Sequence, residues 1–311
     1  MSNILVSGLI NIETTVQVES FPIDYTPVRY PFFGVGSTVS GVGFNIAKAL
    51  TTLGDTVRFL SFVGHDLAGD LARYALKRLG IDPACVVEGL DETPQSVILY
   101  DKTGRRQINV DLKDIQEKVY PVERFDAALK GCSLAALCNI NFSRPLLERA
   151  RRAGVPIATD VHAVSKLDDE YNHEFMEAAQ VLFMSHASLP CAPGDWVKQV
   201  LDRYGCEIIV AGLGADGVLL SVKRDRFLER IPAVVPRKVV NTIGAGDALF
   251  SAFVHGYART GDPYESIRKA VLFASHKIGA TGAADGFLND KQLDRLYSEA
   301  NTGSQGGGRS A

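Results

Sequence analysis

The sequence predicts an α/β fold in which helices cover both faces of a mostly parallel sheet, with a small antiparallel sheet added to it. Three observations predict this class. Short apolar runs rich in β-branched residues indicate strands that are buried on both faces, as in parallel sheets. Segments with a helical period alternate with these runs and end at glycine. Between residues 96 and 110, a hairpin pattern replaces this alternation.

Length and composition limit the protein class further. The chain has 311 residues and no internal linker, so we expect one domain over residues 1–300. The net charge is −3, the pI is about 6.1 and no dense Lys/Arg block occurs, which argues against nucleic acid as a partner. Five scattered cysteines without C-x-x-C spacing favour reduced thiols in a cytoplasm. No apolar run approaches the ~20 residues of a membrane span, and residues 1–11 are too short for a signal peptide, so no membrane partner is expected.

The first predicted strand covers residues 4–10, and its continuous apolar pattern places it centrally in the sheet. Asn11 and Glu13 follow at its carboxyl end, where open α/β sheets tend to bind ligands. Both are therefore candidate substrate contacts. The alternative is a polar strand end that faces solvent.

The next elements lead away from the main sheet and back to it. Residues 14–38 are rich in Pro, Tyr and Phe without a helical period, which indicates strands and loops. A helix begins near Ser40 and ends at Gly54, and a second helix begins after a strand, with Asp66 as its N-cap. The expected hairpin then joins the earlier segment in a small antiparallel sheet, with strands drawn from about 12–38 and 88–114.

The second half of the chain returns to alternating strands and helices. Residues 212–217 match the spacing G-x-G-x-x-G, but a strand pattern follows in place of a helix, so we predict a hairpin turn. Asp262 and Pro263 indicate the start of a helix that ends near residue 280. The tail, residues 301–311, is rich in Gly and Ser and is expected to be disordered.

The strongest functional pattern lies in residues 241–247, between the apolar pair Val239 and Val240 and a helical pattern. The order indicates a strand, a tight turn and a helix. A Gly-Ala-Gly turn at a helix start leaves backbone N–H groups unpaired beside the positive end of the helix dipole, so it suits an anion. Asp247 follows directly as a candidate general base, and phosphoryl transfer to a hydroxyl needs this combination. The alternative is a glycine-rich helix start that Asp247 caps.

This stretch resembles the signature D-T-x-G-A-G-D of the ribokinase-like (PfkB) carbohydrate kinases, with Asn241 in place of the first Asp. The resemblance implies a ribokinase-like fold in which the small sheet is a lid. It also implies ATP with Mg²⁺ as the phosphoryl donor and Asp247 as the catalytic base. The amides of Gly244, Ala245 and Gly246 would form the anion hole of that family.

Two further stretches resemble the acceptor side of these kinases. Residues 8–13 are similar to the family's first-strand motif, although Glu13 replaces the usual Asp. Residues 40–47 resemble G-G-x-G-x-N-x-A, with Ser40 at the first glycine, and the glycines would let the backbone approach a sugar. The implied substrate contacts are Asn11, Glu13, Gly41, Gly43, Asn45 and Asp247.

Three stretches resemble the nucleotide side. Residues 185–188 stand where the family has N-x-x-E but lack its carboxylate, and residues 212–217 are similar to the loop T-x-G-x-x-G. Residues 282–286 match a loop that closes over the nucleotide and completes a monovalent-cation site. Because Asn241 lacks a carboxylate, any K⁺ site is expected to be weak. The implied nucleotide contacts are Ser185, Gly212, Gly214, Gly217, Val271 and Gly282, and the implied K⁺ contacts are Asn241, Ile243 and Gly282.

The resemblance spans about residues 3–290 and implies an ATP-dependent kinase that phosphorylates a hydroxymethyl group of a sugar or related polyol. Two alternatives stay open: a nucleoside kinase of the same fold, and a non-catalytic sensor of a sugar or nucleotide. The absence of G-x-x-x-x-G-K-[ST] excludes a P-loop kinase. The lid of the family often forms a dimer interface, so a second copy of the chain is the implied macromolecular partner.

Overall fold

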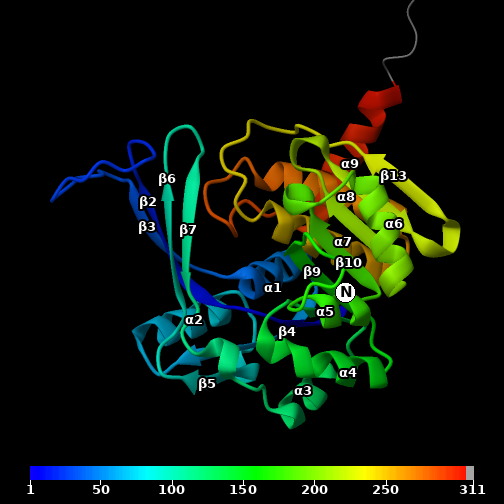
Figure 1. Cartoon of the computed structure of the whole chain (residues 1–311), viewed down its shortest axis with the longest axis horizontal. Coiled ribbons are helices and arrows are strands. Elements are labelled where there is room, and N and C mark those ends of the chain that lie inside the picture. Colours follow the sequence, from blue (N-terminus) through cyan, green and yellow to red (C-terminus); the bar gives the residue numbers. More distant parts are fainter. Residues whose placement is uncertain (306–311) are drawn as a thin grey trace, which may run out of the picture.

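A computed structural model describes residues 1–305 and shows a nine-stranded sheet in the order β13-β12-β11-β10-β9-β8-β1-β4-β5 (Figure 1). All neighbouring pairs from β5 to β11 are parallel, whereas β12 and β13 are added antiparallel at one edge. The predicted mostly parallel sheet is confirmed. Its strands are β1 (Asn3–Ser7), β4 (Thr56–Gly64), β5 (Val86–Leu90), β8 (Leu134–Leu137), β9 (Ile157–Ala163), β10 (Val181–Ser185), β11 (Ile208–Gly212), β12 (Val218–Val222) and β13 (Phe227–Ile231).

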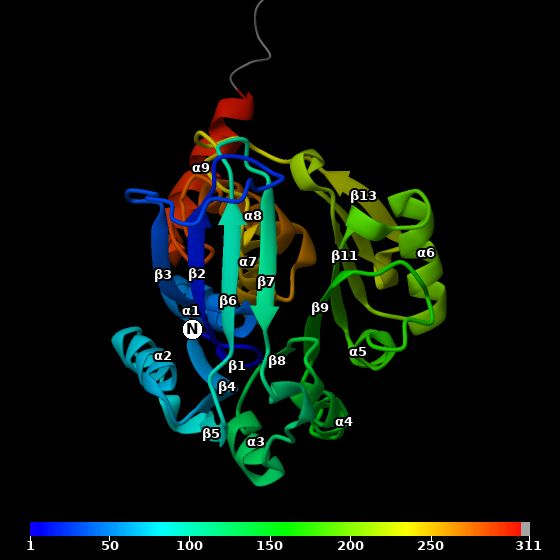
Figure 2. The same cartoon turned by 60° about the vertical axis from the view of Figure 1, so that its left-hand side comes forward.

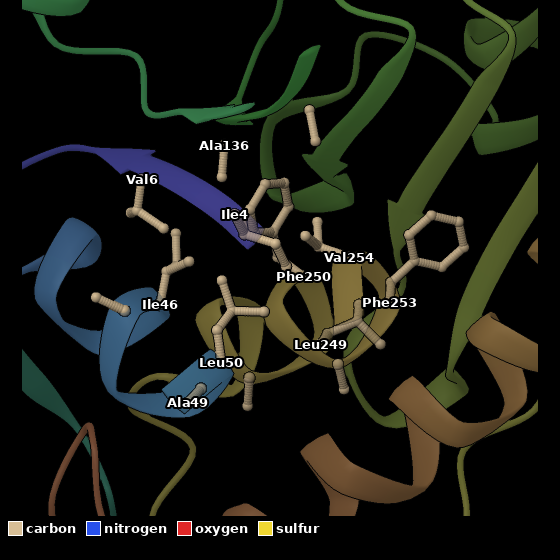
Figure 3. Packing of buried hydrophobic residues seen from close by; sticks show 14 of the residues in the cluster. Ile4, Val6, Ile46, Ala49, Leu50, Ala136, Leu249, Phe250, Phe253 and Val254 are labelled. Carbon is tan, nitrogen blue, oxygen red and sulfur yellow. The ribbon is translucent and has the colours of Figure 1, made fainter. Parts of the chain in front are cut away.

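Helices cover both faces of this sheet, because side chains that alternate along each strand enter two separate cores. In β1, Ile4 and Val6 join one core while Leu5 joins the other. In the first core, β1 and β8 pack against α1 and α7, as Figure 3 shows. The second core is closed by α3 to α6. The helices are α1 (Val42–Leu53), α2 (Leu67–Arg78), α3 (Val122–Leu129), α4 (Arg144–Arg152), α5 (His173–Ala178), α6 (Pro193–Tyr204), α7 (Ala245–Thr260), α8 (Pro263–Lys277) and α9 (Asp290–Gln305).

The lid is a separate four-stranded sheet in the order β3-β2-β6-β7, and it stands beside the main body (Figure 2). The predicted hairpin is confirmed, since β6 and β7 pair antiparallel around residues 101–105. However, β2 and β6 are parallel, so the sheet is mixed and not purely antiparallel as expected. The lid strands are β2 (Asn11–Gln17), β3 (Val35–Ser40), β6 (Gln95–Tyr100) and β7 (Arg106–Asp111).

Two predicted strands differ from the structure. The first strand ends at Ser7, and the chain then turns toward the lid. At this turn Gly8 lies close to Gly43, since a Cβ on Gly8 would be 2.8 Å from the Gly43 Cα. Val239 and Val240 belong to a loop, since the amides of residues 240 and 241 both donate to the Ile278 carbonyl at the end of α8. The two apolar valines therefore predicted a strand, but the backbone of this segment forms hydrogen bonds with the end of a helix and not with another strand.

The remaining expectations concern the end of the chain and membrane spans. Helix α9 continues to Gln305, five residues into the predicted disordered tail, and residues 306–311 lie outside the described residues. Within residues 1–305, none of the helices has both the length and the apolar character needed to cross a bilayer.

Candidate active site

Helix α7 begins in a turn that only glycine can form at its first position. Gly244 caps the helix with φ 74°, and a Cβ there would lie 2.2 Å from the Ala283 carbonyl oxygen. The side chain of Asn241 accepts a hydrogen bond from the Ile243 amide at 2.9 Å and so fixes the preceding residues. The turn thereby presents the amide of Gly246 at a helix N-terminus, while the Ala245 amide makes a long hydrogen bond of 3.3 Å to the Thr242 carbonyl oxygen.

Asp247 lies in the first turn of α7 and keeps partial access to solvent. Asn45, on α1, donates a hydrogen bond from Nδ2 to Asp247 Oδ2 at 2.8 Å. Burial raises the pKa of the Asp247 carboxyl, and this effect outweighs the hydrogen bond from Asn45 and the positive charges of His162 and Lys277. The side chain is therefore a more basic carboxylate than an exposed Asp, held in one orientation.

A chain of polar side chains connects Asp247 to the lid. Ser40 Oγ lies 3.1 Å from Glu13 Oε2 and 3.4 Å from Asn45 Oδ1, so its single proton can be donated to either. Burial also raises the pKa of the Glu13 carboxyl, against the hydrogen bond from Ser40. Ser40 and Glu13 both depart from the family motif, and the structure shows that the two departures contact each other.

Asn11 is 3% exposed and donates from Nδ2 to Ser96 Oγ at 3.1 Å. Its Oδ1 atom has no hydrogen-bond partner among the described residues. A buried acceptor without a partner is costly and marks a position where a ligand hydroxyl would be stabilised. The strand register places Asn11 and Glu13 on the same face of β2.

That face of the lid lines a cleft of about 710 Å³ whose opposite wall is formed by the loops at 239–243 and 281–285. Arg106 on β7 donates to Thr242 Oγ1 at 3.3 Å and so joins the lid to the turn before α7. Asp247 does not itself line this cleft, and polar contacts through Asn45 and Ser40 connect it to Glu13, which does. The side chains and loops that line the cleft are Glu13, Thr15, Gln17, Gly36, Ser37, Thr38, Tyr100, Asp101, Lys102, Thr103, Gly104, Arg106, Val239, Val240, Asn241, Thr242, Ile243, Thr281, Gly282 and Asp285.

Gly41 and Gly43, predicted to let the backbone approach a sugar, are required by chain packing. Gly41 has φ 104°, and a Cβ there would lie 2.6 Å from the Leu9 carbonyl oxygen. A Cβ on Gly43 would lie 2.5 Å from the carbonyl carbon of Gly8. The two glycines thus hold the start of α1 against the turn between β1 and β2, which brings Asn45 toward Asp247.

Four of the six predicted nucleotide contacts, Ser185, Gly212, Gly214 and Gly217, lie at the carboxyl ends of β10 and β11 or in the turn that follows, whereas Gly282 lines the lid cleft. Ser185 and Gly212 are register partners there, and His186 Nδ1 lies 2.8 Å from the Gly212 carbonyl oxygen. Gly214 and Gly217 form the turn into β12, as the predicted hairpin requires. By contrast, Val271 is 5% exposed and packs in the hydrophobic core, so its contact with adenine stays a prediction.

Three residues near Asp247 were missed from the sequence. Lys277, at the end of α8, is completely buried and donates from Nζ to the Ile243 carbonyl oxygen. Asp160 Oδ2 lies 3.9 Å from the Cβ position of Gly246, and Asp160 Oδ1 accepts from the His162 amide at 2.8 Å. The available signal was a polar pair, Asp160 and His162, at the end of a buried strand, and a lysine in the last turn of a helix whose neighbouring turns are apolar.

Comparisons with known proteins agree with this geometry. Residues 1–290 match the model of a protein family that is described as pfkB family carbohydrate kinase. Acarbose 7(IV)-phosphotransferase of Actinoplanes sp. is 27% identical over 85% of this chain and 88% of its own length. The 1-phosphofructokinase of Haloferax volcanii is 28% identical over 85% and 88% of the two chains.

Solved structures match the fold in the same way. A microbiome-derived acarbose kinase, Mak1, superposes with a TM-score of 0.86 at 24% identity, covering 96% of this chain and 99% of its own. At this identity the superposition shows the fold, while the sequence match over residues 1–290 shows the family. The chain therefore belongs to the PfkB family of carbohydrate kinases and is an ATP-dependent sugar kinase.

Proposed function

We propose that this kinase transfers the γ-phosphoryl group of ATP to a hydroxymethyl group of a sugar or related polyol, with Asp247 as the base. The supporting observation is the chain of polar contacts from Asp247 through Asn45 and Ser40 to Glu13, which connects the start of α7 to the cleft. Such a chain orients a base and places hydroxyl-binding groups within reach of it.

In this mechanism Asp247 accepts the proton of the attacking hydroxyl, and Asn45 holds the carboxylate in place. The amides of Gly244, Ala245 and Gly246 stabilise negative charge on the transferring phosphoryl group. Asn11, with its unpaired Oδ1, and Glu13 accept hydrogen bonds from other hydroxyls of the acceptor. These contacts fix the acceptor for in-line attack.

Mg²⁺ commonly binds through phosphate oxygens and one or two carboxylates, so a dedicated protein cage is not needed. In the part of the chain that the structure describes, no group of three or more His, Cys, Asp or Glu side chains is arranged so that it could hold a metal ion. Asp160, next to Gly246, is the carboxylate that we assign to the water shell of the ion. When bound with ATP, Mg²⁺ neutralises charge on the phosphates.

The cleft lining favours a neutral polyhydroxylated acceptor. Hydroxyl and amide side chains predominate in it, and Tyr100 is its one aromatic residue, which leaves little surface on which a purine could stack. Three carboxylates and two cations line it, so there is no excess of positive charge for a sugar phosphate. A nucleoside or a phosphorylated sugar is therefore a poorer fit than a neutral sugar.

An acceptor panel tests this proposal by coupled detection of ADP release. The panel contains ribose, fructose, 2-keto-3-deoxygluconate, fructose 1-phosphate, adenosine and acarbose, the last because two similar proteins are named as acarbose kinases. We expect the highest kcat/KM with a neutral sugar. Preference for adenosine or the sugar phosphate would contradict the acceptor assignment, and binding without ADP release for every acceptor would instead support a sensor.

We further propose that two copies associate through their lids. Every residue of β7 is exposed, and Val35 and Val97, which the strand registers place on the face of the lid opposite Glu13, are 57% and 40% exposed. Exposed apolar side chains on an open sheet gain stability when another surface covers them. We expect sedimentation at twice the chain mass of 33.6 kDa.

Charge placed in the proposed interface should separate the two copies. Val97→Lys is expected to give a monomer at micromolar concentration, because an ammonium would be buried in the interface. Val119→Lys is the matched control, since Val119 is 69% exposed on the main body. A wild-type monomer, or a Val97→Lys dimer of unchanged affinity, would contradict the lid interface.

The cellular location that we propose is the cytoplasm. All five cysteines are free thiols, and three of them are buried, which is compatible with a reducing compartment. Fractionation of cells that produce the protein checks this location.

A further inference from the structure

A buried lysine lies directly beneath the turn that begins α7. Lys277 is 0% exposed, and its Nζ donates to the carbonyl oxygen of Ile243, the residue before Gly244. Burial lowers the pKa of the Lys277 ammonium to about 8, while the carboxylates of Asp247, Asp285 and Glu13 attract the ammonium and limit this loss. The hydrogen bond to the Ile243 carbonyl and these charges compensate part of the hydration that a buried cation loses.

Asn241 contributes differently from a carboxylate at the same position. Its Nδ2 donates to the Thr281 carbonyl oxygen at 2.8 Å, and its Oδ1 accepts from the Ile243 amide at 2.9 Å. The side chain therefore joins the loops at 241–243 and 281–285, and its one oxygen is engaged within the turn. The Asn241 side chain is neutral, so it offers no negative charge that would attract an ion.

Two of the three residues expected to form a K⁺ site, Asn241 and Ile243, do not fit that ion. Potassium requires several oxygen ligands, but the Ile243 carbonyl already accepts from Lys277, and Asn241 directs an N–H donor toward the neighbouring loop. A second cation beside the Lys277 ammonium would also be repelled at short range in a partly dehydrated site. The Lys277 ammonium already supplies the positive charge that a monovalent ion would bring.

We propose that the Lys277 ammonium is the resident cation of this site and makes the kinase independent of potassium. Lys277 is a positioning residue: it holds the Ile243 carbonyl while Asn241 holds the Ile243 amide, and so it fixes the turn whose amides meet the phosphoryl group. Because this cation is part of the polypeptide, the site needs no ion from solution. The inference rests on the proposed function of the Gly244–Gly246 turn.

The wild-type enzyme gives the first test, because it needs no variant. Acceptor-dependent ADP release and the Tm are measured in tetramethylammonium chloride, NaCl and KCl at equal ionic strength. We expect kcat to agree within about twofold among the salts, and the Tm to agree within about 1 °C. Activation by KCl of about tenfold or more would overturn the proposal.

Removal of the ammonium should create a requirement for a cation. Lys277→Ala is expected to lose about tenfold or more in kcat in tetramethylammonium chloride, and KCl or methylammonium chloride should restore most of it. Lys269→Ala is the matched control: Lys269 is on the same helix but pairs with Glu265 and Asp294, each at 2.7 Å. It should show no response to either salt. A folded Lys277→Ala with normal kcat in tetramethylammonium chloride would overturn the proposal.

The double variant Asn241→Asp/Lys277→Ala separates this inference from the proposed function. It restores a carboxylate and removes the ammonium, so KCl should raise its Tm by about 2 °C or more over tetramethylammonium chloride, while the wild-type Tm stays constant. This binding measurement does not require an acceptor. If the double variant shows no difference in Tm between the salts, the proposal fails even when the kinase assay succeeds; if the wild type shows no kinase activity but the Tm responses appear, the proposed function alone fails.

Discussion

At the scale of single residues, the site depends on the Asp247 carboxylate, whose ionised form is disfavoured by burial and favoured by a hydrogen bond. Burial raises the pKa of Asp247, whereas the hydrogen bond from Asn45 lowers it. A general base works best when its pKa is close to the operating pH, so a raised pKa increases its capacity to accept a proton. Asn45 counteracts this shift and favours the ionised form.

Removal of that hydrogen bond should move the acid limb of the pH profile. Asp247 acts only when ionised, so activity falls as the pH decreases through its raised pKa. Asn45→Leu removes the contact that favours the ionised form, and its acid limb should lie at higher pH in a kcat/KM profile. Asn109→Leu, an exposed lid position, is the control and should leave the limb in place. A shift of the Asn45→Leu limb to lower pH would contradict this account.

Loss of the buried charge should stabilise the fold while it removes the base. Because the folded-state pKa of Asp247 is raised, ionisation at pH 7 disfavours the folded state, and this penalty disappears below the pKa of the unfolded chain. Asp247→Asn should therefore raise the Tm at pH 7 by about 2 °C, with a smaller gain near pH 4. A lower Tm at pH 7 in thermal unfolding would show that the carboxylate stabilises the fold.

At the scale of elements, the start of α7 is the feature that the sequence predicted best. The glycine turn and the helix follow from local residue types, so the boundary at Gly244 agrees with the predicted turn. The break after Ser7 and the loop at residues 239–240 could not be predicted, since both depend on contacts with distant residues. Lys277 was missed for the same reason: only the folded chain places it against Ile243.

The two glycines of this turn should differ in their tolerance of a side chain. Gly244→Ala would force a left-handed backbone on alanine and place its Cβ against the Ala283 carbonyl oxygen, so we expect a loss of more than about 2 kcal/mol in the free energy of unfolding. Gly246→Ala should unfold with the same free energy or a higher one, because the nearest atom is 3.9 Å from its Cβ and alanine favours helices. If urea titrations gave the same loss in the free energy of unfolding for Gly244→Ala and Gly246→Ala, the described turn would be contradicted.

At the scale of the whole molecule, the cleft exists because two segments of the chain leave the main sheet and form the lid: β2 and β3 between β1 and α1, and β6 and β7 after β5. The mostly parallel body followed from the alternation of apolar runs and helical segments in the sequence. The mixed lid did not, because the parallel pairing of β2 with β6 joins segments about 80 residues apart, and strand patterns carry no partner information. The lid face and the loops beyond residue 239 meet only in the folded chain.

Far from the cleft, a buried polar cluster joins the loop before β4 to α7 and α9. His255 Nδ1 lies 2.7 Å from Asp55 Oδ2, and the Asp55 side chain is 0% exposed. His255→Ala removes a hydrogen-bond partner of that buried carboxyl group and leaves a cavity, so we expect a loss of roughly 2–3 kcal/mol in the free energy of unfolding. Arg259→Ala, which breaks an ion pair near the surface with Asp290, should cost about 1 kcal/mol or less. Chemical denaturation of both variants checks the order; a larger cost for Arg259→Ala would contradict it.

The most direct test of the central claim is the turnover of Asp247→Asn with the best acceptor of the panel, measured together with its affinity for ATP. If Asp247 takes the hydroxyl proton, kcat should fall by about 10³-fold, while the Kd for ATP by calorimetry stays within about threefold of the wild type. A turnover within about tenfold of the wild type would show that another group is the base.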